Sequence, residues 1–128
     1  MHEIKITIKS SSRSLNDLLR MHWAVRKKLK DDLAWEVFAE LNKVDPDHEV
    51  VRTPQKVFMK ITSYRKSFLD KDNFFGGLKE LIDVIKELRL IYDDSPEYLN
   101  LEAEQKIEKK RKEQRTEIFI KWQKYSGF

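Results

Sequence analysis

The 128-residue chain contains no cysteine and has only three glycines, three prolines and three histidines. The lack of cysteine excludes disulfides, thiolate zinc sites and cysteine nucleophiles. Because the histidines are far apart in the sequence, a metal would be held mainly by oxygen ligands, which Mg²⁺ and Mn²⁺ prefer. No apolar run approaches the ~20 residues of a membrane span, and the first residues lack the apolar segment of a signal peptide. We therefore expect a cytoplasmic protein that has no membrane partner.

The residues that are present suit one folded domain. Apolar residues make up 40% of the chain and charged residues 38%, which is too much apolar content for a disordered protein. There are 26 basic and 22 acidic side chains, which give a net charge of +4. This surplus permits nucleic-acid binding without establishing it. We expect residues 1–128 to form a single domain with a sizeable core.

Hydrophobic periodicity predicts the order of the elements. Alternating residues predict strands over 3–9, 56–64, 97–107 and 116–123, and apolar residues at helical spacing predict helices over about 20–42 and 74–88. Loops are expected over 10–17 and 44–55, and a short further strand over 89–94. The basic stretch 106–115 is expected to be the tip of a long antiparallel hairpin. The order predicts an α+β fold, with two main helices and a mixed or antiparallel sheet.

Two acidic pairs flank the second predicted helix. Asp70 and Asp72 precede it, and Asp93 and Asp94 follow it. Alone, such acids are typical of helix caps and turns. In an extended segment, however, residues i and i+2 point to the same side, so Asp70 and Asp72 would converge on one ion. An acid at the end of a strand over 89–94 would then meet them. The spacing leaves both interpretations open.

The start of the same helix carries two adjacent glycines. Gly76 and Gly77 each cost roughly 1 kcal/mol relative to alanine in a helix, which indicates a close backbone approach or a forced turn. Lys79 and Asp83 are four residues apart, so a surface ion pair is their simplest use. A lysine can also stabilise the charge that builds on a phosphate during its hydrolysis, while a metal lowers the pKa of the attacking water. Acids, lysine and net positive charge together fit metal-dependent phosphodiester hydrolysis.

The segment resembles the RusA family of Holliday-junction resolvases, particularly the phage-borne members. That family has a D-x-D-N motif, a lysine, an aspartate four residues later, and an acidic pair. The matching residues here are Asp70, Asp72, Asn73, Lys79, Asp83, Asp93 and Asp94. The stretch SLNDLLRMHWAVRKKLK over 14–30 is also similar to family members. Two features depart from the shorter family form: the longer spacer that contains Gly76 and Gly77, and Leu69 where that form has an arginine.

The resemblance implies a Mg²⁺-dependent homodimer that makes paired symmetric nicks in a four-way DNA junction during recombination and repair. It implies metal ligation by Asp70, Asp72 and Asp94, with Asp93 as an auxiliary ligand and Lys79 as the catalytic lysine. DNA contacts are expected from Asn16, Arg20, Arg26, Lys27, Lys28, Arg65, Lys66 and Asn73. The basic residues from Lys109 to Lys112 are either a second DNA-binding element or a solvated turn. Trp23, Trp35 and Trp122 are expected in the core or at a dimer interface.

Other functions fit the same residues. A nuclease of this chemistry can act on forks or flaps, and a non-catalytic DNA-binding dimer can keep the fold. A plain interaction domain would use the acids only as caps and turns. The glycine-containing spacer is typical of the phage-type form, which suggests a phage- or prophage-encoded protein in a bacterial cytoplasm.

Overall fold

A mixed sheet forms the centre of the computed structural model, which describes residues 2–9 and 14–122. Its strands are β1 (His2–Ile8), β2 (Val57–Arg65), β3 (Leu99–Ile107) and β4 (Arg115–Trp122). They lie side by side in the order β1-β4-β2-β3. β2 is parallel to β3 and antiparallel to β4, and β4 is antiparallel to β1. The predicted α+β fold class is confirmed.

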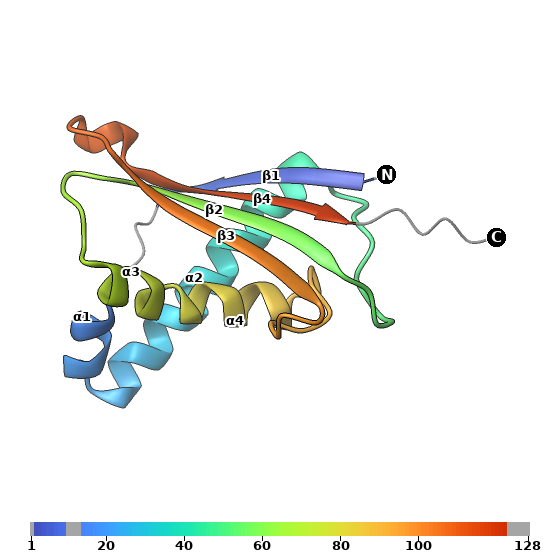
Figure 1. The fold of residues 1–128 in the computed structure, drawn as a ribbon, viewed down its shortest axis with the longest axis horizontal. Coiled ribbons are helices and arrows are strands. Elements are labelled where there is room, and N and C mark those ends of the chain that lie inside the picture. Colours follow the sequence, from blue (N-terminus) through green and yellow to red (C-terminus); the bar gives the residue numbers. More distant parts are fainter. Residues whose placement is uncertain (1, 10–13, 123–128) are drawn as a thin grey trace.

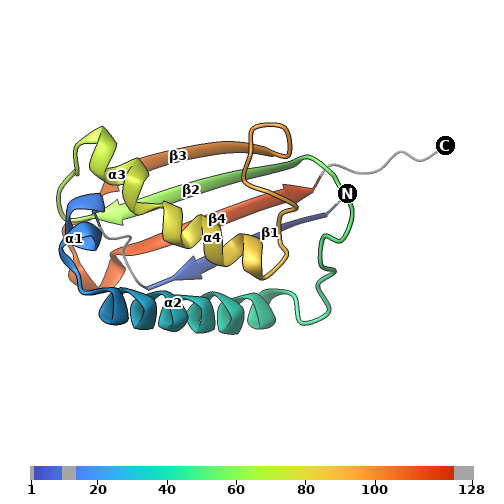
Figure 2. The same cartoon turned by 90° about the horizontal axis from the view of Figure 1, so that it is seen from below.

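The helices α1 (Leu15–Arg20), α2 (Trp23–Val44), α3 (Lys71–Gly77) and α4 (Lys79–Glu87) lie on one face of the sheet (Figure 1). Viewed from the helical side, α2 runs along the β1 edge, and α3 and α4 cross beneath the other strands (Figure 2). A short 3₁₀ helix, η1 (Arg111–Glu113), lies in the connection between β3 and β4. The opposite face of the sheet carries no helix within the described part of the chain.

The alternation in the strands creates the core between the two layers. On β1 and β4, the isoleucines at every second position turn toward the helices and are buried. The helices contribute apolar residues three or four positions apart, the spacing that places side chains on one helical face. The central residues of this core are Ile6, Ile8, Val37, Leu41, Met59, Ile61, Leu81, Val84, Ile85, Ile118 and Ile120.

The first predicted helix is divided in two, and it begins earlier than expected. Ser14 caps α1 by accepting a hydrogen bond from the Asp17 N–H at 3.1 Å. After a break at Met21 and His22, His22 Nδ1 accepts from the Ala24 N–H at 3.2 Å and starts α2. The loop prediction over 10–17 is therefore wrong from residue 15 onward, and residues 10–13 lie outside the described part. Ser14 acts as a helix cap. The loop was predicted because the neighbouring serines are typical of a loop.

The second predicted helix also consists of two segments, α3 and α4, which meet at Leu78. The strand expected over 89–94 is not formed. Arg89 has a φ of 59°, the left-handed conformation that commonly ends a helix. The chain turns there, and Leu90 and Ile91 enter the core without pairing to a strand. Their apolar character reflects packing in the core and not a strand.

The predicted hairpin of the last two strands is wrong, because β2 lies between β3 and β4. The connection over 108–114 passes the end of β2 and does not close a tight turn. β2 is buried along most of its length, so a neighbour on each side satisfies its backbone hydrogen bonds. Two alternating segments with a polar connection predict two strands, but they do not specify which strand lies beside which.

The tryptophans divide between the core and the surface. Trp122 is buried, and its Nε1–H donates to the Leu90 carbonyl at 2.9 Å, so its core assignment is confirmed. Trp23 and Trp35 are 72% and 71% exposed on α2, so a core position is wrong for both. Trp35 instead contacts Phe38 edge-on with ring centroids 6.2 Å apart. An interface role for these two residues stays a prediction.

Candidate functional site

The first acidic pair lies at the start of α3. Asp70 is the N-cap, and its Oδ1 accepts a hydrogen bond from the Asn73 N–H at 3.3 Å. Asp72 lies in the first turn, and both side chains are exposed. Neither carboxylate forms an ion pair with any residue that the structure describes. The capping interpretation is confirmed for Asp70, yet a carboxylate has about four acceptor positions, so capping leaves most of them free.

The residue before this pair is fixed by a side chain of β3. Gln105 Oε1 accepts from the Leu69 N–H at 2.9 Å, and Gln105 Nε2 donates to the Leu69 carbonyl at 3.0 Å. Both backbone groups of Leu69 are therefore satisfied by one amide, as they would be by a neighbouring strand. The sequence pattern alone does not single out Gln105. The one signal in the sequence was that Gln105 is polar although it occupies an inward-facing position in the alternation of the strand.

The opposite side of α3 is held by α1. The Asn16 N–H donates to Asn73 Oδ1 at 3.0 Å. A Cβ atom placed on Gly76 would lie only 2.7 Å from Leu15 Cδ2, so the close backbone approach predicted at the glycine pair is confirmed at Gly76. Asn16 and Asn73 were expected to contact DNA. In this structure they join α1 to α3, and their DNA contacts stay predictions.

The second acidic pair follows α4 and is bound to a lysine of that helix. Lys86 Nζ lies 2.8 Å from Asp93 Oδ1 and 3.9 Å from Asp94 Oδ1. The hydrogen bond from Lys86 lowers the pKa of Asp93 to about 2, and the same bond raises the pKa of Lys86. The sequence pattern alone gives Lys86 no role beyond that of a charged residue on the helix. Its position seven residues before Asp93 was the available signal.

The two acidic pairs are not gathered around one ion within the chain. They lie at opposite ends of the unit formed by α3 and α4 (Figure 1), and the 16 residues of these two helices alone would span roughly 24 Å end to end. Among the residues that the structure describes, no group of three or more potential ligands is close enough to hold a metal. One chain alone therefore does not fit the expected Mg²⁺ site of Asp70, Asp72 and Asp94.

The expected catalytic lysine, Lys79, is the first residue of α4 and is exposed. It makes no ion pair within the described ranges. Asp83, its expected partner, instead lies 4.0 Å from Lys30 Nζ on α2. Lys79 follows Asp72 by seven residues, on the other side of the junction at Leu78 between α3 and α4.

Two of the arginines expected to bind DNA have partners inside the protein. Arg26 Nε contacts Glu80 Oε1 at 2.5 Å, which ties α2 to α4. Arg65 is half-buried at the end of β2 and donates to Ser63 Oγ at 3.3 Å. Burial lowers the pKa of Arg65, and the nearby Asp17 carboxylate opposes that shift. Both residues thus have structural roles, and their DNA contacts stay predictions.

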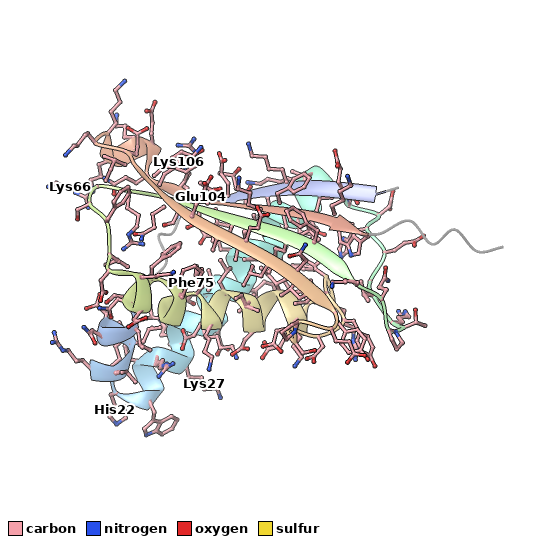
Figure 3. All side chains as sticks on the ribbon, viewed as in Figure 1. His22, Lys27, Lys66, Phe75, Glu104 and Lys106 are labelled. Carbon is pink, nitrogen blue, oxygen red and sulfur yellow. The ribbon has the colours of Figure 1, made fainter. Side chains whose placement is uncertain are left out.

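Exposed basic side chains flank the start of α3. Lys66 lies toward the sheet side of α3, and Lys27 lies beyond its other side with the start of α2 (Figure 3). The basic connection (Lys109, Lys110, Arg111 and Lys112) is exposed around η1. In Figures 1 and 2, α1, the start of α2, α3 and η1 lie at the same end of the molecule. Arg20 and Lys28 are also exposed at this end.

The fold and the site thus define an α+β protein with unpaired carboxylates among exposed cations. Searches of protein-family models, curated proteins and solved structures found no match to the chain. No helix in the described ranges has the length and apolar character that crossing a bilayer requires.

Proposed function

We propose that this protein is a Mg²⁺-dependent, structure-specific endodeoxyribonuclease that cuts four-way DNA junctions by paired nicks, with Mn²⁺ as an alternative metal. The observation that carries the proposal is the position of Asp70 and Asp72. They are exposed and have no ion pair with a described residue, yet exposed basic side chains lie on both sides of them. Carboxylates in a phosphate-binding surface repel the phosphate unless a cation lies between them.

The separation of the acidic pairs supports a homodimer. A four-way junction presents two symmetric strands, so a two-fold dimer would present one site to each. If the α3–α4 units of two chains lie antiparallel, each start of α3 lies beside the other chain's segment after α4. We infer that Asp70 and Asp72 of one chain act with Asp94 of the partner subunit, and that Asp93 of the partner subunit is auxiliary.

Each group of this shared site has a distinct task. A bound Mg²⁺ would neutralise phosphate charge and lower the pKa of the attacking water. Lys79, exposed at the start of α4, would stabilise the negative charge that builds on the phosphate. Arg20, Lys27, Lys28, Lys66 and the basic connection would bind the phosphates that flank the cut. Their binding is expected to weaken steeply as salt concentration rises.

The test is cleavage of a synthetic four-way junction with Mg²⁺ by the wild type, Asp72→Asn and Asp32→Asn. Asp32 is an exposed helical acid on α2, so its variant matches the change in charge. We expect Asp32→Asn to cut normally and Asp72→Asn to lose about 100-fold or more, since even outer-shell changes cost 10–100-fold at metal sites. If the wild type cuts no branched DNA, including forks and flaps, the nuclease proposal is wrong. Equal cutting by all three proteins would refute the assigned site.

Mixed dimers test whether the site is shared between chains. Asp72→Asn and Asp94→Asn chains, each with a different tag, are co-expressed and the heterodimer is purified. In a shared arrangement, one site of the heterodimer carries both changes and the other carries neither. We expect nicking of one junction strand by the heterodimer and no cutting by either parent. An inactive heterodimer would show that each site belongs to one chain.

A further inference from the structure

β3 is an edge strand with one side open. Its inner side pairs with β2, and no other strand in the described ranges meets its outer side. The Val57 N–H donates to the Tyr98 carbonyl, and the Glu108 N–H donates to the Arg65 carbonyl. Because successive residues of a strand direct their backbone groups to opposite sides, the even-numbered residues face β2. The residues that direct N–H and C=O groups outward in the middle and end of β3 are Leu101, Ala103, Gln105 and Ile107.

This edge lacks most of the features that block strand addition. It is nine residues long and contains neither proline nor glycine, so only its charged side chains oppose pairing with another strand. Those charges are Glu102, Glu104 and Lys106, on the face of the sheet opposite to α1–α4. They are of both signs, so a strand with a complementary arrangement of charge would pair with β3 favourably.

A second copy of β3 supplies that complementary arrangement. When two β3 strands pair antiparallel around Glu104, each Glu102 lies opposite Lys106 of the partner subunit. On the helical face, each Leu101 lies opposite Ile107 of the partner subunit, and Ile107 is 44% exposed in the single chain. Because of the two-fold symmetry, the interface contains two Glu102–Lys106 pairs. It also covers the exposed Ile107 of each chain.

Neighbouring registers are less favourable. A centre at Ala103 places Glu102 opposite Glu104 of the partner subunit. A centre at Gln105 places Glu102 opposite Glu108 of the partner subunit, and these repulsions offset the attraction between Glu104 and Lys106 of the partner subunit. Each of these like-charge pairs occurs twice. The centre at Glu104 has a single like-charge pair, and Glu104 already lies 3.4 Å from Lys60 Nζ and 3.7 Å from Lys106 Nζ. These lysines offset the repulsion between the two glutamates.

We propose that the protein dimerises through its β3 edge, with two antiparallel β3 strands centred on Glu104 joining the two sheets into one. The interface deepens the proposed function, since it rests on the dimer that the nuclease requires. A two-fold axis perpendicular to the sheet keeps all helices on one face and reverses α3 and α4. In Figure 2, α3 and the segment after α4 lie near opposite ends of β3, so the two-fold rotation would bring the partner's segment after α4 toward the end of β3 where Gln105 holds Leu69.

The test measures the dimer dissociation constant by sedimentation equilibrium at low salt, without DNA or metal. Glu102→Lys and Lys106→Glu each convert two attractive pairs into repulsive ones, and we expect each to raise Kd about ten-fold or more. The double variant restores opposite charges and should return Kd to within about three-fold of the wild type. Lys121→Glu, an exposed change of the same kind on β4, should leave Kd unchanged. A monomeric wild type, or a double variant as weak as the singles, overturns the interface.

Ala103→Pro gives a second test that keeps the fold. The backbone N–H of Ala103 points away from β2. Proline at this position therefore removes one outward-facing donor and leaves the hydrogen bonds between β3 and β2 intact. We expect a monomer with cooperative thermal unfolding and no junction cleavage. A monomer that cleaves at the wild-type rate overturns the interface as the basis of the nuclease, yet leaves the nuclease itself. A dimer with the expected charge dependence that never cleaves DNA supports the interface and removes the proposed activity.

Discussion

The two acidic pairs of this chain are held in different ways. Asp93 and Asp94 share Lys86 at 2.8 and 3.9 Å, so their own chain neutralises part of their charge. Asp70 and Asp72 lack such a cation among the described residues, and their segment is held by Gln105, Asn16 and the contact at Gly76. Backbone contacts can thus fix carboxylates without neutralising them. The first pair is therefore open to an external cation, whereas the second must release Lys86.

The largest effect is expected from breaking the packing that holds the first pair. Gly76→Val places a branched side chain against Leu15, whose Cδ2 would lie 2.7 Å from a Cβ at this position. Overpacking of this kind typically costs about 1–3 kcal/mol, and we expect about 2–3 kcal/mol because valine adds poor helix propensity. Urea denaturation measures the loss of unfolding free energy.

Leu15→Ala is the matching change on α1. If the contact with Leu15 causes the loss, the double variant should recover part of the stability, and the two changes should not be additive. Strict additivity of the two single effects would place the cost of Gly76→Val elsewhere. The Lys86 hydrogen bonds to the second pair should be unaffected, since they lie at the other end of the α3–α4 unit.

A smaller loss is expected when the amide that holds Leu69 is removed. Gln105→Leu is similar in size but leaves the N–H and C=O of Leu69 without their partner. Unsatisfied partly buried groups cost about 1–3 kcal/mol. We expect a loss of about 1–2 kcal/mol in urea denaturation, with faster hydrogen exchange at the Leu69 amide.

Gln105→Glu separates the two hydrogen bonds of that amide. It keeps an acceptor for the Leu69 N–H and loses the donor to the Leu69 carbonyl. We therefore expect slow exchange at the Leu69 amide in this variant. Rapid exchange in Gln105→Glu and Gln105→Leu alike would mean that the acceptor does not protect this amide.

The smallest effect concerns the second pair and depends on pH. Because the hydrogen bond from Lys86 lowers the pKa of Asp93 to about 2, this contact stabilises the fold above the ordinary aspartate pKa. The stabilisation is lost as pH falls through about 2. Lys86→Met should lower Tm slightly at pH 5, and the difference from the wild type should shrink toward pH 2. Circular dichroism melts across this range measure it.

Lys28→Met is the control for that titration, since Lys28 is exposed and makes no ion pair with the part of the chain that the structure describes. Its Tm difference from the wild type should not depend on pH in this range. A difference for Lys86→Met that is constant from pH 5 to pH 2 would contradict the role of Asp93.

The sequence predicted local features, such as strands and a close approach at a glycine, better than it predicted which distant residues contact each other. The alternation of Ile4, Ile6 and Ile8 predicted β1, and the cost of glycine in a helix indicated the close approach at Gly76. The break in the first helix was missed because Ser14 and His22 act as caps in surroundings that resemble a loop or a helix. Gln105 was missed because only its contact with Leu69, 36 residues away, gives it a role.

By itself, the sequence determined which residues are apolar, charged or permissive, and so the strands, most of the helical residues and the chemistry of the acids. Those properties depend on residues a few positions apart. Only the tertiary structure decided that β2 separates β3 from β4, and that the two acidic pairs lie at opposite ends of α3 and α4. Such arrangements depend on which buried surfaces and backbone groups meet across the fold, and many pairings satisfy the same local pattern.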